Sequence, residues 1–95
     1  MPRRYRVAAA PAFEREVRRP RKRLPRVYES LLEAVELLET DPFNLGGHAK
    51  VRKLVEVPKG QGQFRLRVGG YRMRCDIVGD EVILHSMRPR GKSYR

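Results

Sequence analysis

Apolar and polar residues alternate most regularly over residues 64–75, where two such runs flank a pair of glycines. This pattern predicts a β-hairpin with a two-residue turn at Gly69-Gly70. The turn fixes the register, which places Val68 opposite Tyr71 and makes each face of the hairpin chemically uniform. One face is apolar. The other face carries four arginines, namely Arg65, Arg67, Arg72 and Arg74.

Two helices are predicted in the first half of the chain. A short helix starts at Pro11, because proline is well suited to the first turn of a helix. Apolar residues at helical spacing predict a longer helix that starts at Pro25 and ends at Asp41-Pro42, since the residue before a proline avoids the helical conformation. Between the helices, residues 18–26 form a dense basic turn, for which a solvated loop and a dedicated binding patch both stay open.

Further strands are predicted on both sides of these helices and after the hairpin. Residues 5–8 form a short strand before the helices. A second two-residue turn at residues 79–80 leads from the hairpin into a strand over residues 82–87. A short apolar alternation at residues 54–57, inside a loop-like stretch, is a candidate strand extension.

The resulting order is β-α-α-β-β-β, and residues 1–95 form a single domain. This order predicts an α+β fold, in which two helices pack on one face of a small, mainly antiparallel sheet. The register also places His85 beside Arg74, on the side of the sheet that carries the arginines.

The charge of the chain favours polyanionic partners. Its 22 Lys and Arg residues outnumber its 11 Asp and Glu residues, which gives a net charge of +11. Nucleic acid is the commonest partner for such a charge, although an anionic membrane surface or an acidic protein fits the same field. Like charges that face each other across a sheet destabilise it by about 1 kcal/mol in water. A fold that keeps four arginines on one face therefore indicates a bound anion.

Several functional classes are not supported. No segment has the apolar length of a membrane span, and the charged N-terminus lacks the apolar run of a secretory signal, so we expect a cytoplasmic protein. The lone Cys75 excludes an internal disulfide and is expected to be a small core residue. Because His48 and His85 lack the spacing of metal ligands, we expect no metal and no other cofactor.

The tail over residues 88–95 is strongly basic and leaves the sheet at Pro89. A disordered tail is one interpretation. In the other, the tail leaves beside the arginines and brings Arg88 and Tyr94 to the rim of the same surface. Cations with an aromatic ring are the combination that single-stranded RNA recognition uses, for phosphates and a stacked base respectively.

Five segments, in order along the chain, carry a resemblance to a known family. They are Tyr5-Arg6-Val7, Asp41-Pro42-Phe43, Arg52-Lys53-Leu54, the block over residues 64–74 and the ending over residues 88–95. With this order and spacing the chain resembles the RelE/ParE toxin superfamily, and more closely its RelE-type messenger-RNA endonucleases. The resemblance implies the toxin of a type II toxin–antitoxin module, bound by a cognate antitoxin. It also implies metal-independent cleavage of mRNA in the ribosomal A site, by attack of a ribose 2′-hydroxyl on the scissile phosphate.

The resemblance also assigns roles to residues by position. Arg72 and Arg88 match phosphate-stabilising arginines, Tyr94 matches a C-terminal tyrosine, and Arg65 and Arg67 match a basic pair on a strand. These five are the expected catalytic residues. The expected RNA-binding residues are Arg74, Lys53, Arg90, Lys92 and His85. Guanidinium groups keep their protons near neutral pH, so proton transfer would fall to Tyr94, to His85 or to groups of the RNA or ribosome.

Two alternative functions stay open. A ParE-type toxin binds and inhibits DNA gyrase and cuts no RNA, but that branch typically lacks the residue set named above. A passive nucleic-acid-binding module could use the same basic sheet without any toxicity.

Overall fold

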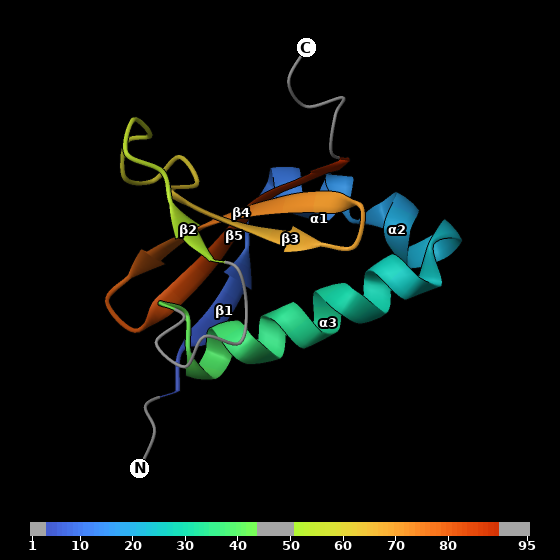
Figure 1. Cartoon of the computed structure of the whole chain (residues 1–95), viewed down its shortest axis with the longest axis horizontal. Coiled ribbons are helices and arrows are strands. Elements are labelled where there is room, and N and C mark those ends of the chain that lie inside the picture. Colours follow the sequence, from blue (N-terminus) through green and yellow to red (C-terminus); the bar gives the residue numbers. More distant parts are fainter. Residues whose placement is uncertain (1–3, 44–50, 90–95) are drawn as a thin grey trace.

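The structure is a computed structural model that describes residues 4–43 and 51–89. In these ranges the chain forms three helices and one five-stranded sheet with the order β1-β5-β4-β3-β2 (Figure 1). Strand β1 runs parallel to β5, and the other neighbours are antiparallel. The predicted α+β fold with a mainly antiparallel sheet is confirmed. The elements are β1 (Arg6–Ala9), α1 (Pro11–Glu16), α2 (Arg18–Arg23), α3 (Pro25–Thr40), β2 (Arg52–Lys53), β3 (Phe64–Val68), β4 (Tyr71–Val78) and β5 (Glu81–Pro89).

The core lies between the sheet and helices α1 and α3. The apolar face of the β3–β4 hairpin is buried there, as the alternation predicts. Burying a large apolar side chain contributes about 1.5–3 kcal/mol, so this layer holds the sheet and helices together. The buried residues from the helices are Phe13, Val17, Leu31, Ala34 and Leu38; those from the strands are Phe64, Leu66, Val68, Met73, Cys75, Val82, Leu84 and Met87.

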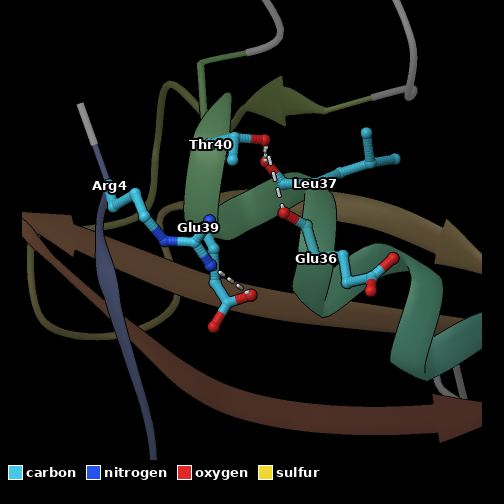
Figure 2. Close-up of polar contacts among 5 residues, drawn as sticks. All are labelled: Arg4, Glu36, Leu37, Glu39 and Thr40. Carbon is cyan, nitrogen blue, oxygen red and sulfur yellow. Dashed lines mark hydrogen bonds and ion pairs between the residues drawn. The ribbon is translucent and has the colours of Figure 1, made fainter. Parts of the chain in front are cut away.

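The C-terminal end of α3 is tied to the start of the chain (Figure 2). Arg4 forms an ion pair with Glu39 at 3.5 Å. The Thr40 hydroxyl lies 3.4 Å from the carbonyl oxygens of both Glu36 and Leu37, to which it donates. Helix α3 ends at Thr40, immediately before Asp41-Pro42, as predicted.

The prediction of a basic turn over residues 18–26 is wrong for most of that stretch, because residues 18–23 form helix α2. Pro20 is the third residue of this helix. A backbone N–H at that position has no intrahelical acceptor, so a proline, which lacks the N–H, costs no hydrogen bond there. Arginine and lysine also have high helix propensity. The proline therefore lies in the first turn of a helix here and does not break it.

The prediction of a strand extension at residues 54–57 is also wrong. The strand, β2, lies two residues earlier and pairs Arg52 with Arg65 and Lys53 with Phe64. The apolar alternation that suggested the extension is not buried, since Val55 is 95% exposed.

The β4–β5 pairing starts as predicted and then shifts by one residue. From the turn at residues 79–80 the register is regular as far as Cys75, which lies opposite Leu84. Arg74 then pairs with Ser86, so His85 is the extra residue of a β-bulge.

This bulge changes the side of the sheet on which every later β5 residue lies. Met87 pairs with Met73 in the core, and Arg88 lies opposite Arg72. An unbroken register would have placed Met87 among the arginines and Arg88 opposite Tyr71. The bulge therefore delivers Arg88 to the same side of the sheet as the hairpin arginines.

Candidate nucleic-acid interface

Six arginines share the side of the sheet that faces away from the helices, here called the arginine face. Directly paired residues on antiparallel strands lie about 5 Å apart and on the same side. One row crosses β2, β3 and β4 and consists of Arg52, Arg65 and Arg74. The second row crosses β3, β4 and β5 and consists of Arg67, Arg72 and Arg88.

A hollow of about 350 Å³ opens among these side chains. Its size is at the lower end for small-ligand sites and is sufficient for a phosphate group with part of a nucleotide. Arg52 and Arg67 are exposed, whereas Arg65 and Arg72 are partly buried. The hollow is lined by Arg52, Arg65, Leu66, Arg67 and Arg72. Arg52 is a member that sequence reasoning missed, because a two-residue strand leaves no periodic pattern.

The loop over residues 58–63 covers one end of the arginine face, around Asp76 and Arg74; this is called the covered end, and the end with Arg67, Arg72 and Arg88 is called the open end. The buried Asp76 carboxylate anchors this loop by accepting three backbone N–H groups. The donors are Gly60 at 3.1 Å, Gly62 at 2.9 Å and Gln63 at 3.1 Å. A buried carboxylate needs such donors, and each hydrogen bond to a charged group contributes about 1.5–3 kcal/mol.

Arg74 is part of the same arrangement. Its Nε donates to the Gly62 carbonyl and its Nη2 to the Gln61 carbonyl, both at 2.9 Å. Gly62 has a φ of +78°, and a Cβ at that position would lie 3.0 Å from the Cβ of Arg74. The sequence predicts an RNA-binding role for Arg74, but in the structure its guanidinium holds the loop.

His85 lies beside Arg74 on the arginine face, as predicted. A Cβ at Gly62 would lie 3.3 Å from the His85 ring, so the loop packs over the histidine. The buried Nδ1 of His85 has no hydrogen-bond partner within the described residues. His85 is not among the residues that line the hollow.

Arg88 is held by a carboxylate from the first helix. Its Nε donates to Oε2 of Glu16 at 3.0 Å, and Oε1 of the same carboxylate accepts the backbone N–H of Met87 at 3.1 Å. Sequence reasoning missed Glu16, because this residue lies more than 70 positions before its partners and no local pattern connects them.

The structure separates one predicted residue from the arginines. Lys53 pairs with Phe64, whose side chain belongs to the core, so the register places Lys53 on the helix side of the sheet. Its neighbour Arg52 lies on the arginine face instead. The predictions for Arg90, Lys92 and Tyr94 fall outside the described residues.

Cys75 offers no nucleophile. Burial raises the pKa of its thiol from 9.0 to about 12, and the adjacent Asp76 carboxylate adds to the rise. Within residues 4–43 and 51–89, no group of three or more His, Cys, Asp or Glu side chains could hold a metal ion. No helix in these ranges is long and apolar enough to cross a bilayer.

The arginines around the hollow can bind and stabilise an anion, but they cannot donate or accept a proton in a reaction. A guanidinium group presents up to five N–H donors in a fixed plane and pairs with two phosphate oxygens at once. Directed at a phosphorus centre that gains charge during a reaction, such donors lower the barrier. A base and an acid for a ribonuclease reaction must come from other groups.

The comparisons with known proteins establish the architecture. No protein-family model matches the sequence, and no curated protein does. Among solved structures, YafQ in the DinJ–YafQ toxin–antitoxin complex of Escherichia coli has a TM-score of 0.75 at 13% identity, covering 97% of this chain and 99% of that one. The archaeal RelE–RelB complex of Pyrococcus horikoshii matches at 24% identity with a TM-score of 0.69, covering 93% and 97%. The YoeB dimer of Staphylococcus aureus matches at 14% identity with a TM-score of 0.72, covering 90% and 95%. The chain therefore has the fold shared by RelE, YafQ and YoeB, over nearly its whole length.

Proposed function

We propose that this protein is the toxin of a type II toxin–antitoxin module and that it cleaves messenger RNA in the ribosomal A site without a metal. The observation that carries the proposal is the row of Arg67, Arg72 and Arg88 on three adjacent strands, beside the hollow. Three neighbouring cations repel one another, and although Arg88 donates to the Glu16 carboxylate, the row carries an excess of positive charge that favours a phosphate beside it. The fold adds support, because its structural neighbours include toxins in complex with their antitoxins.

In the proposed reaction the ribose 2′-hydroxyl attacks the adjacent phosphorus and the bond to the 5′-oxygen breaks. The attacking oxygen loses a proton, and the departing oxygen gains one to become a 5′-hydroxyl. Arg72 and Arg88 donate hydrogen bonds to the non-bridging oxygens, on which negative charge grows in the transition state. Arg67 and Arg65 hold the RNA backbone. Tyr94 is the proposed group for orienting or deprotonating the nucleophile or for stacking on a base.

The proposed partners follow from this chemistry. They are mRNA, the ribosome and a cognate antitoxin, all in the cytoplasm. The net charge of +11 suits an antitoxin with an acidic segment. A segment of that kind over the arginine face would neutralise both its field and its activity.

The test is primer extension on cellular transcripts after the protein is induced. Wild type should produce specific cuts within codons. Arg72→Ala and Arg88→Ala should each reduce cleavage by about 100-fold or more, the usual loss when one transition-state donor is removed. Arg21→Ala, on α2 and away from the hollow, is the matched control and should cleave like wild type.

Two results would contradict the proposal. Intact transcripts together with growth arrest and DNA-damage signalling would favour gyrase inhibition. Tight RNA binding without cleavage or toxicity would favour a passive nucleic-acid-binding module.

A further inference from the structure

We infer that Glu16 is a positioning residue, which fixes the Arg88 side chain so that its terminal amino groups face the scissile phosphate. This inference rests on the proposed function, because it assigns the role of Arg88 in that site. The two hydrogen bonds of the Glu16 carboxylate, to the Met87 N–H and the Arg88 Nε, carry it.

The contact lies where the sheet gives Arg88 little other support. Strand β1 pairs with β5 as far as Leu84, and the Ala10 N–H then donates to the Leu84 carbonyl. Beyond this point the edge of β5 faces α1. Glu16, the last residue of α1, reaches this edge and accepts the N–H of Met87, so one carboxylate satisfies the strand edge and the arginine together.

The carboxylate itself is firmly placed. Phe13 and the residue that follows the helix, Val17, are both buried in the core. The Glu16 side chain is 25% exposed, whereas that of Arg88 is 62% exposed. A long, exposed arginine samples many rotamers. Anchoring its Nε to a carboxylate on a packed helix removes much of that freedom before RNA binds.

The geometry of the pair leaves the useful part of the guanidinium available. Glu16 occupies the Nε edge, and the two Nη groups form a separate pair of donors that can bind two phosphate oxygens. The bulge at His85 places Arg88 opposite Arg72 and beside the hollow that Arg72 lines, so both arginines can reach one phosphate bound there. Preorganised donors of this kind need no reorganisation as charge develops.

Two other ion pairs of the described residues differ from this one. Arg4–Glu39 and Arg6–Asp80 are single contacts at 3.5 Å. An exposed pair of this kind contributes little to stability. Glu39 therefore offers a matched control, a glutamate paired with an arginine on a helix away from the hollow.

The first experiment is a double-mutant cycle on ribosomes programmed with a defined mRNA. Single-turnover cleavage is measured for wild type, Glu16→Ala, Arg88→Ala and the double variant, with thermal unfolding of each protein. Glu16→Ala should slow cleavage about 10-fold, and it should cause no further loss when Arg88 is already alanine, because Glu16 acts through Arg88. Glu16→Gln, which keeps an acceptor oxygen, should retain more activity than Glu16→Ala, and Glu39→Ala should match wild type.

A general loss of structure would slow the reaction in both backgrounds, so multiplicative effects of the two changes would overturn the inference. Cleavage by Glu16→Ala at or above the wild-type rate would also overturn it, since the carboxylate would then restrain the site. If wild type itself cuts no RNA, the proposed function fails, and the inference fails with it.

The second experiment needs no activity. NMR relaxation of the arginine Nε–H groups should show an ordered Arg88 in wild type and in Glu39→Ala, and a mobile one in Glu16→Ala. Equal order in wild type and Glu16→Ala would overturn the positioning role even if the protein is a nuclease.

Discussion

The two ends of the arginine face are built from the same strands but treat charge in opposite ways. At one end the 58–63 loop covers Asp76 and Arg74, and every hydrogen bond described for these two side chains goes to loop backbone. At the other end Arg67, Arg72 and Arg88 form one row across three strands. Arg67 and Arg72 line the hollow, and Arg67 and Arg88 are exposed. The fold thus uses the charged side chains of one end to hold a loop, whereas at the other end it gathers three cations beside a hollow in which an anion can bind.

Replacing the carboxylate at the covered end should have the largest effect on stability. Asp76→Ala removes the acceptor of one buried and two partly buried backbone N–H groups, so the free energy of unfolding should fall by about 3 kcal/mol or more. Denaturant unfolding measures this. Asp80→Ala, which removes an exposed carboxylate paired with Arg6 at 3.5 Å, is the control and should change stability by less than about 1 kcal/mol. Equal losses in both variants would show that the loop anchor has no special role.

A smaller loss is expected from the glycine of the same loop. Gly62→Ala combines a positive φ with a Cβ contact of 3.0 Å to Arg74, so it should reduce the free energy of unfolding by about 2 kcal/mol. Gly70→Ala is the control at the other end, because Gly70 lacks a positive φ and a Cβ there meets nothing within 4 Å. An unchanged midpoint for Gly62→Ala would mean that the loop does not pack on Arg74 as described.

Cys75 lies in the core beneath the covered end, and its buried thiol makes the stability of the protein depend on pH. The thiol pKa is raised from 9.0 to about 12 in the folded protein, so its contribution to stability is complete below pH 9 and is lost as the pH rises towards 12. At pH 7, Cys75→Ala should be about 1 kcal/mol less stable than wild type, because a small buried group is lost. The difference should narrow above pH 9 in chemical denaturation. A constant difference across this range would contradict the buried, protonated thiol.

The smallest effect is expected at the open end. Arg67→Ala removes one of three neighbouring cations, so its free energy of unfolding should equal that of wild type or exceed it by up to about 1 kcal/mol. Raising the salt concentration should reduce any gain, since salt screens exposed charges. A clear loss of stability would show that Arg67 contributes to the folded state and is not reserved for an anion.

The features that could be predicted from the sequence are those that depend on local spacing along the chain. The turn at Gly69-Gly70 fixes a local register, so the four hairpin arginines and the buried face opposite follow from the alternation. The bulge does have a trace in the sequence, since Val82, Leu84 and Met87 are spaced by two and then by three. That spacing moves Arg88 to the arginine face.

The remaining features depend on contacts between distant segments. Asp76 and the 58–63 loop are separated by the whole of β3, and Glu16 meets Arg88 72 positions later. Neither contact leaves a periodic signal in its own segment. Strand β2 is too short for any alternation, so the sequence shows neither that Arg52 lies on the arginine face nor that Lys53 lies on the helix side of the sheet.

The most direct test of the open end is the salt dependence of RNA binding. A single-stranded RNA with a 2′-deoxy nucleotide at the cleavage site cannot react, so its affinity can be measured by anisotropy from low to moderate salt. Contacts to three phosphates, one held by Arg65, one by Arg67 and the scissile one by Arg72 together with Arg88, predict a log-log slope of about −2 for the association constant. Loss of one of these phosphate contacts, as in Arg67→Ala, should reduce its magnitude by about 0.7. Arg6→Ala, at the far edge of the sheet, should leave the slope unchanged. A variant in which Arg67, Arg72 and Arg88 are all replaced by alanine, and which keeps the wild-type slope and affinity, would contradict the account.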